Sequence, residues 1–242
     1  MQKLKKMYRA DYTGEDILVN TTYRNATWEY EYETVPNRVN NIQISNRACV
    51  IGNGESRSGF NLNWYLKNHR GGMGGSLALQ TYGCNALYRD YSPHFLVATG
   101  NEMISEIANG PYCYDHIVYS NSSALLKYPG KFYLVPQDVQ YNAGTIATYL
   151  ACFDGHKMVF LLGFDNKTNT NLYEGTPCYA EKGTFQDDTY FIKAMEMIMK
   201  TYNDVEFIRV MPIKEWAQPP SWQALPNFRQ INFQEWAYLA DL

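Results

Sequence analysis

The sequence predicts an α/β fold: a Rossmann-like, mostly parallel sheet of about seven strands with helices on both faces. From residue 47 onward, short apolar runs alternate with segments whose apolar residues recur at helical spacing. Short, continuously apolar runs are typical of parallel strands that are covered on both faces. A strand–helix–strand order joins such strands by crossover connections. The length of 242 residues fits one α/β domain with extensions and allows a substantial core.

Seven segments are expected to form the strands of this sheet, because each is short and apolar. They are Arg47–Ile51, Leu77–Tyr82, His94–Ala98, His116–Tyr119, Phe132–Val135, Met158–Leu162 and Val205–Val210.

Two helices between these strands are well marked. The first, Asn142–Phe153, opens with an asparagine suited to capping, and Gly155 after it suits a left-handed helix end. The second, Asp188–Tyr202, carries an apolar stripe at three- and four-residue steps, which we expect to face the core. The stripe comprises Phe191, Ile192, Met195, Ile198, Met199 and Tyr202.

The segments on either side of residues 47–212 are expected to be extensions of the core that these residues form. Residues 1–46 are polar and irregular, with Tyr–Glu alternation and a turn at Pro36-Asn37, and we expect them to wrap the core, with or without a short edge strand. Residues 213–242 are rich in aromatic residues and proline. Because exposed tryptophans are costly, this segment is expected to cover the sheet edge, to shape an acceptor pocket, or to bury against a second subunit in a homo-oligomer.

Composition and charge argue against several classes of protein. The net charge of −3 gives no basic field for nucleic acid. The five cysteines are widely spaced and contain no Cys-x-x-Cys pair, so no structural zinc site is expected. Their odd number suits a reducing compartment and predicts a cytoplasmic location. The basic first residues are not followed by an apolar run, so no signal peptide is expected, and no run reaches membrane-spanning length.

The most informative segment is an apolar strand that leads directly into a Gly-Asn-Gly-x-Ser turn, formed by Gly52, Asn53, Gly54 and Ser56. Glycines let the backbone turn sharply and approach a ligand closely. Amides at the start of a following helix attract an anion. The segment therefore predicts a phosphate-binding loop, with a tight turn as the structural alternative. It is not the dinucleotide fingerprint, because Arg57 stands where that pattern has its third glycine.

Polar or small residues also follow other expected strands. Asn85 comes soon after the second strand, Gly144 and Thr145 open a helix, and Asp165 follows the strand that ends at Leu162. Ligands of doubly wound sheets bind outside the carboxyl ends of the strands, at the switch point. We therefore expect one cleft that Asn53, Asn85 and Asp165 face. The structural alternatives are a helix cap for Asn85 and a turn former for Asp165.

Several of these segments belong to an ordered series of motifs over about residues 48–212. The series is Val50-Ile51-Gly52-Asn53-Gly54-x-Ser56, Cys84-Asn85-x-x-Tyr88, Gly144 at a helix start, Gly155-x-Lys157-x-x-Phe160-Leu161-x-Gly163-x-Asp165, Ile192-Lys193-Ala194-Met195-Glu196 and Lys200-Thr201-Tyr202 before a strand and Pro212. Because its motifs occur in the same order, the chain resembles the bacterial lipooligosaccharide sialyltransferases, which use CMP-sialic acid and form glycosyltransferase family 42. It also resembles related Rossmann-like bacterial proteins of unknown function.

The resemblance implies roles for the residues that match. Asn53 and Gly54 would hold the nucleotide phosphates, and Asn85 would contact the nucleotide sugar. Gly144 and Thr145 would contact the base and ribose through the start of their helix.

Further along the chain, Asp165 matches the aspartate of the family's Gly-Ile-Asp motif. Tyr173, eight residues later, would hydrogen-bond the leaving phosphate. The family is similar to metal-independent transferases, so the resemblance implies no metal and no cofactor besides the nucleotide-sugar substrate, which is CMP-linked in the family.

The chain also departs from the family at two catalytic positions. Lys167 replaces the family's other phosphate tyrosine, and a lysine can still balance phosphate charge as a point cation. Gln186 stands in place of the catalytic histidine, and glutamine cannot act as a general base. The neighbouring Asp187 or Asp188 would either take over as base or merely cap the helix.

The sequence therefore predicts nucleotide or nucleotide-sugar binding, with glycosyl transfer to a glycan acceptor as the leading hypothesis. The reaction would be a direct displacement at the anomeric carbon. The alternative is a non-catalytic nucleotide- or sugar-binding module that has lost the family's histidine. A phosphate-transfer enzyme on the same kind of fold would need a Mg²⁺ site, which the sparse carboxylates near these loops do not readily supply.

Overall fold

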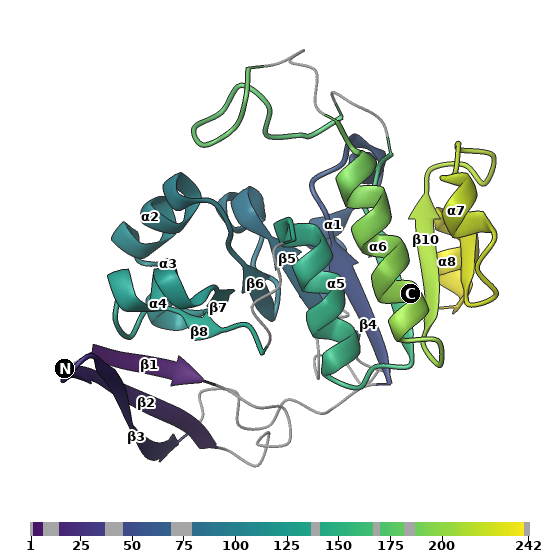
Figure 1. Ribbon diagram of the computed structural model, residues 1–242. Coiled ribbons are helices and arrows are strands. Elements are labelled where there is room, and N and C mark those ends of the chain that lie inside the picture. Colours follow the sequence, from purple (N-terminus) through teal and green to yellow (C-terminus); the bar gives the residue numbers. More distant parts are fainter. Residues whose placement is uncertain are drawn as a thin grey trace.

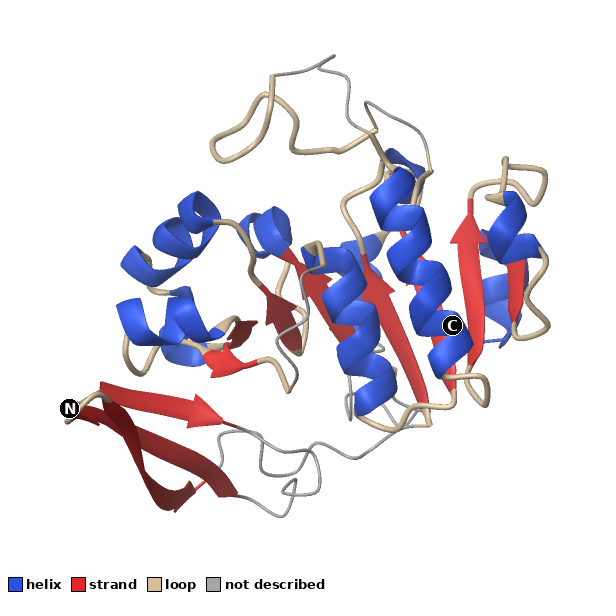
Figure 2. Cartoon of the chain, in the orientation of Figure 1, coloured by secondary structure: helices blue, strands red, loops and turns tan. Residues whose placement is uncertain are grey.

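The computed structural model describes residues 2–6, 15–36, 46–68, 79–136, 141–166, 170–181 and 187–239. These residues form a mostly parallel sheet with helices on both faces (Figure 1, Figure 2). The predicted Rossmann-like α/β class is confirmed.

The parallel part of the sheet runs in the order β11-β10-β9-β4-β5-β6-β7-β8, and every neighbouring pair in it is parallel. The chain first builds the strands on one side of β4 and then returns through a helix to β9 on its other side. The switch point therefore lies between β4 and β9. The strands are β4 (Arg47–Ile51), β5 (Gln80–Cys84), β6 (Phe95–Val97), β7 (Ile117–Ser120), β8 (Tyr133–Leu134), β9 (Met158–Leu162), β10 (Glu206–Met211) and β11 (Phe228–Asn232).

All seven expected strands are present, and the bounds of β4 and β9 are those predicted. The largest shift is in β5, which continues to Cys84, so Gly83 and Cys84 belong to a strand and not to the turn after it. The expectation of about seven strands is an undercount, because the described residues form a sheet of eleven. The four additional strands come from the segments expected to be extensions.

The amino-terminal segment contributes three of these strands: β1 (Gln2–Lys6), β2 (Glu15–Arg24) and β3 (Thr27–Pro36). β2 and β3 form an antiparallel hairpin, and β1 joins it to β8. Asn25 and Ala26 close the hairpin with φ angles of 50° and 59°, the left-handed pair that suits a two-residue turn between twisted strands. The Tyr–Glu alternation noted in the sequence is thus the period-two pattern of a strand.

The carboxyl-terminal segment adds β11 as a parallel edge strand beside β10. Trp222 and Trp236 are fully buried, in the hydrophobic clusters on opposite faces of the sheet. Of the three expected roles for this segment, covering the sheet edge is the one observed. The proposed homo-oligomer stays a prediction that these two buried indoles do not support, and so does the division into residues 1–46, 47–212 and 213–242.

The helices cover both faces. Ala48 and Val50 face the cluster that includes α5 and α6, whereas Cys49 and Ile51 face the cluster that includes α1, α2 and α8. The helices are α1 (Leu62–Asn68), α2 (Asn101–Asn109), α3 (Tyr112–Asp115), α4 (Ser122–Lys127), α5 (Ala143–Phe153), α6 (Thr189–Thr201), α7 (Pro220–Gln223) and α8 (Phe233–Leu239), with 3-10 turns η2 (Glu55–Arg57) and η3 (Asn85–Arg89).

The two predicted helices are confirmed as α5 and α6. Asn142 caps α5, because its Oδ1 accepts a 2.9 Å hydrogen bond from the Thr145 amide, and Gly155 has the left-handed φ of 87° expected beyond the helix end. On α6, Met195 and Met199 are fully buried, so the methionine-rich stripe is core, as expected.

None of the five cysteines, which all lie within the described ranges, forms a disulfide bond. No helix within the described ranges combines the length and the apolar character needed to cross a membrane.

Candidate functional site

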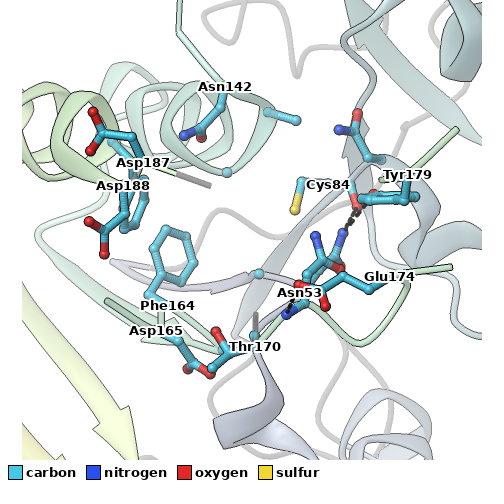
Figure 3. Close-up of a pocket in the computed structure, with 18 residues that line it drawn as sticks. Asn53, Cys84, Asn142, Phe164, Asp165, Thr170, Glu174, Tyr179, Asp187 and Asp188 are labelled. Carbon is cyan, nitrogen blue, oxygen red and sulfur yellow. Dashed lines mark hydrogen bonds between the residues drawn. The ribbon is translucent and has the colours of Figure 1, made fainter. Parts of the chain in front are cut away.

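A pocket of about 290 Å³ opens at the carboxyl ends of β4, β5 and β9, beside the switch point (Figure 3). The starts of α5 and α6 and the loop of residues 170–181 complete its wall. Doubly wound sheets place their ligands at this position. The pocket is therefore the candidate functional site.

The structure brings most of the predicted site residues to this pocket. Asn53, Asn85 and Asp165 all line it, so the expected single cleft exists. The predicted residues in its lining are Gly52, Asn53, Gly54, Asn85, Gly144, Asp165, Asp187 and Asp188. Their roles in ligand binding stay predictions.

Three other predicted residues do not line the pocket: Ser56, Thr145 and Tyr173. Ser56 and Thr145 are buried, and the amide of each binds a neighbouring side chain, Asp165 for Ser56 and Asn142 for Thr145. Lys167 and Gln186 lie outside the described residues.

Three amides of the glycine turn after β4 are already hydrogen-bonded within the protein. The Gly52 amide donates to the Leu162 carbonyl at 2.8 Å, and the Gly54 amide donates to the Gly163 carbonyl at 2.9 Å. The Ser56 amide donates to Asp165 Oδ2 at 3.1 Å. β9 and the loop after it therefore already use these three amides, and the role of the turn in holding phosphate stays a prediction.

Close packing of the two loops explains the glycines. A Cβ atom on Gly52 would lie 2.5 Å from the Gly163 carbonyl oxygen, and one on Gly54 would lie 2.5 Å from Asp165 Cγ. Real Cβ atoms do not approach other atoms so closely, so no larger residue fits without movement. Gly54 itself has an ordinary φ of −69°, whereas Gly163 is left-handed at 73°. The turn therefore requires glycine at position 54 for space and not for its φ angle.

Asp165 ties these loops together. Its Oδ2 accepts from the Ser56 amide, while its Oδ1 is buried and accepts from no described residue. Arg209 holds the same loop from β10, because its Nε donates to the Phe164 carbonyl and its Nη2 to Asn166 Oδ1, both at 2.8 Å. Burial lowers the pKa of Arg209 to about 10, and the charge of Asp165 partly offsets that effect. Asp165 thus has a structural role, because it connects the loops after β4 and β9. Its Oδ1 has no hydrogen-bond partner among the described residues.

The start of α5 gives the pocket its anion-attracting element. Asn142, Ala143 and Gly144 line the pocket. The first intrahelical bond runs from the Ile146 amide to the Asn142 carbonyl, so the amides of Ala143 and Gly144 have no partner inside the helix. Free amides and the positive end of the helix dipole favour negative charge. The predicted role of a helix start in this site therefore fits the geometry, through Gly144 and its neighbour Ala143.

Asn85 presents a donor to the pocket. Its Oδ1 accepts a 2.9 Å bond from the Thr99 amide, which fixes the orientation of the side-chain amide. The Nδ2 group then remains available, because no described residue accepts from it. Asn85 also has a left-handed φ of 46°, an uncommon conformation for a residue other than glycine.

Tyr173 lies apart from the pocket. Its hydroxyl donates to Asp90 Oδ2 at 2.7 Å and accepts a long, 3.5 Å bond from Arg57 Nη2. Burial and the bond to Asp90 raise the pKa of Tyr173 well above its usual range. The tyrosine that lines the pocket is Tyr179, six residues later, which sequence reasoning missed. The spacing from Asp165 pointed to Tyr173, and no signal in the sequence pointed to Tyr179 instead.

Tyr179 and Asn53 form a small network at the end of β5 (Figure 3). Asn53 Nδ2 donates to the Cys84 carbonyl at 3.3 Å and to the Tyr179 hydroxyl at 3.2 Å. The Ala86 amide also donates to that hydroxyl, at 3.3 Å. Asn53, which was predicted to hold phosphate, therefore donates its side-chain amide hydrogens to the Cys84 carbonyl and to the Tyr179 hydroxyl.

Asp187 and Asp188 lie at the start of α6, across the pocket from Tyr179 (Figure 3). Asp187 Oδ1 accepts a 2.9 Å bond from the Thr189 amide, and hydrogen bonds from Thr189 lower the pKa of Asp187. Asp188 occupies the cap position but makes no side-chain cap bond. Asp187 therefore bonds the first amide of α6 from the position before the cap, and the carboxylate of Asp188 is the freer of the two. Whether either acts as a base stays a prediction.

The charge of the lining is negative. Four carboxylates contribute to it, and no Lys, Arg or His is present among the described residues that line the pocket. The four are Asp165, Glu174, Asp187 and Asp188. Nor do the described residues contain a group of three or more side chains suited to holding a metal ion.

An ion pair holds the loop that carries Tyr179. Arg89 donates to both carboxylate oxygens of Glu106, at 2.8 and 2.7 Å, and also to Thr176 Oγ1 at 2.9 Å. Cys178 Sγ donates to Glu106 at 3.3 Å, and Cys178 has a left-handed φ of 70°. Cys178, directly before Tyr179, is thus bonded to α2, and Thr176 is bonded to η3.

Comparisons with known proteins give structural similarity only. No protein-family model matches the sequence, and no curated protein matches it either. Among solved structures, the chain is similar to the sialyltransferase CstII from Campylobacter jejuni in complex with a substrate analogue, CMP-3FNeuAc, with 14% identity and a TM-score of 0.41 over 67% of this chain and 79% of that one. It is also similar to an Asn-to-Ala variant of the sialyltransferase CST-II in complex with CMP, with 12% identity and a TM-score of 0.43 over 80% of this chain and 98% of that one.

Proposed function

We propose that the pocket binds a nucleotide or nucleotide-sugar and that the chain is a glycosyltransferase of the sialyltransferase kind. The observation that carries the proposal is the position of the pocket, at the switch point of a parallel sheet with the free amides of α5 at its wall. The ordered motifs in the sequence support it independently, because they lead to the same strand ends.

The proposed reaction is a direct displacement at the anomeric carbon of the donor. The amides of Ala143 and Gly144 are placed to stabilise negative charge on the leaving phosphate. Lys167 is the proposed cation for the same charge. Tyr173 can contribute only if its hydroxyl leaves Asp90, so it is the weaker of the two proposed phosphate ligands.

Asp188 is the proposed general base for the glycan acceptor. Its carboxylate lines the pocket without a cap bond, whereas Asp187 already accepts from Thr189. If neither carboxylate takes a proton, the pocket would bind a nucleotide without turnover, as in the alternative of a binding module.

A thermal-shift panel tests the binding step. CMP, UMP, GMP, UDP and GDP, together with CMP- and UDP-linked sugars, are added with and without Mg²⁺, and the matching nucleosides serve as controls. A ligand that binds only the folded state raises the free energy of unfolding by RT ln(1 + [L]/Kd), and the melting temperature rises with it. We expect a nucleotide or its sugar conjugate to stabilise the protein without Mg²⁺. A panel without any shift would contradict the proposed function.

Gly144→Ala is the matched variant for this panel. A Cβ at this position meets only atoms at 3.6 Å or more, so the fold accepts it, but the methyl group enters the pocket wall beside the free amides. We expect it to reduce the ligand-induced shift. Gly59→Ala is the control, because a Cβ there also has space and Gly59 does not line the pocket.

A further inference from the structure

The neighbours of Tyr179 determine which hydrogen bonds its hydroxyl accepts and which it can still donate. It lines the pocket on the side of Asn53 and Cys84 (Figure 3). A tyrosine hydroxyl has one hydrogen to donate and two lone pairs that can accept. The partners of this hydroxyl show which of the three positions are already used.

The Cys84 carbonyl determines the orientation of Asn53. A carbonyl oxygen can only accept, so the side-chain group of Asn53 that lies 3.3 Å from it must be the amino group. The second hydrogen of this amino group is then directed to the Tyr179 hydroxyl, 3.2 Å away. Asn53 is therefore a donor to Tyr179 and not an acceptor from it.

The Ala86 amide fills the second acceptor position. It is a backbone N–H, which can only donate, and it lies 3.3 Å from the Tyr179 oxygen. Both lone pairs of the hydroxyl are thus used by donors whose direction cannot be reversed. Its hydrogen must point elsewhere, and no described residue accepts it.

We propose that the Tyr179 hydroxyl donates a hydrogen bond to an oxygen atom of the bound ligand, which makes Tyr179 a ligand-contacting residue of the site. The inference rests on the proposed function, since it assigns a residue to the nucleotide or nucleotide-sugar pocket. At this wall the pocket would select a ligand group that accepts hydrogen bonds. Asn85, directly before Ala86, presents its free Nδ2 donor to the same pocket.

Two further observations support this role. Burial raises the pKa of Tyr179 to about 12, so the hydroxyl keeps its hydrogen throughout the neutral range. The loop position is also fixed in advance, because Arg89 and Glu106 hold Thr176 and Cys178 just before Tyr179. Tyr173 differs, since Asp90 already takes its hydrogen.

Tyr179→Phe is the direct test, measured by isothermal titration calorimetry with the nucleotides CMP and UMP and the nucleosides cytidine and uridine. The substitution keeps the ring and removes only the hydroxyl. We expect the Kd of the nucleotide that binds the wild-type protein best to rise about ten- to a hundredfold, as for the loss of a hydrogen bond to a charged acceptor. If the nucleoside loses none of its affinity, the acceptor is a phosphate oxygen; an equal loss for both places it on the base or ribose.

Tyr114→Phe is the matched control, because Tyr114 is 62% exposed and lies outside the pocket. Equal nucleotide affinity for wild-type protein and Tyr179→Phe would overturn this inference and leave the proposed function standing. Absence of nucleotide binding by the wild-type protein would overturn both.

A fluorinated tyrosine at position 179 keeps the proposal testable if the Phe variant does not fold. It preserves the ring and both accepted bonds, but its phenol is a stronger acid. We expect nucleotide affinity to fall as this phenol ionises and loses its hydrogen, at a pH where the wild-type affinity is unchanged. A pH profile identical to that of the wild-type protein would contradict the donor role.

Discussion

At the scale of single residues, Gly54 is a position in the pocket lining that has no space for a side chain. A Cβ there would lie 2.5 Å from Asp165 Cγ and 2.6 Å from the Gly163 carbonyl oxygen. Gly54→Val should therefore separate the loops after β4 and β9. We expect a loss of about 1–3 kcal/mol in the free energy of unfolding, as for overpacked sites, together with loss of nucleotide binding.

Chemical denaturation and calorimetry on the folded fraction measure the two effects of Gly54→Val. Gly59→Val is the control, because the nearest atom to a Cβ there is 3.6 Å away. Unchanged stability and affinity in Gly54→Val would show that the two loops adapt freely and that the glycine turn is not part of the site.

At the scale of elements, the ion pair between η3 and α2 holds the loop of residues 170–181 against the sheet. Glu106→Gln removes the charge that Arg89 and Cys178 share. We expect the melting temperature at neutral pH to fall by about 2–4 °C, the shift that corresponds to about 1 kcal/mol in a chain of this size. We also expect weaker nucleotide binding, because Tyr179 follows Cys178 directly.

The pH dependence of this effect has a definite sign. Hydrogen bonds from Arg89 lower the pKa of Glu106 to about 2. A lowered folded-state pKa gives stability that is complete above the unfolded-state pKa of about 4.3 and is lost as the pH falls towards 2. The melting temperatures of wild-type protein and Glu106→Gln should therefore converge between about pH 4 and pH 2. Glu102→Gln, an exposed change on the same helix, should show no such convergence.

At the scale of the whole molecule, charge works against an anionic ligand. The chain has a net charge of −3, and four carboxylates line the pocket. Asp187→Asn and Asp188→Asn should each tighten nucleotide binding a few-fold at low ionic strength, and the gain should shrink as salt screens the repulsion. Asparagine caps a helix as well as aspartate does, so stability should be kept.

The same two variants separate repulsion from catalysis. If Asp188 is the base, Asp188→Asn should lose turnover of a nucleotide-sugar while it binds the nucleotide more tightly. Asp115→Asn, an exposed change outside the pocket, is the control. If Asp188→Asn leaves both affinity and turnover unchanged, its carboxylate neither repels the ligand nor acts as the base.

The sequence by itself determined those features that depend on local pattern and on general rules of connection. Apolar runs located β4 and β9, and the capping residue and helical spacing located α5 and α6. The switch-point rule then brought Asn53, Asn85 and Asp165 to one pocket, because parallel strands end on the same edge of the sheet.

Only the tertiary structure decided which polar groups are free, because their partners are remote in sequence. Asn53 donates a hydrogen bond to Tyr179, which is 126 positions later in the sequence. The Tyr173 hydroxyl donates to Asp90, which is 83 positions earlier, and this bond holds it apart from the pocket. The amides of Gly52, Gly54 and Ser56 looked free in the sequence, yet they donate to β9 and to the loop after it. The local sequence pattern predicts the helix or strand that a segment forms. Whether a polar group in that segment can still bind a ligand depends on the hydrogen bonds that it makes to neighbours elsewhere in the fold.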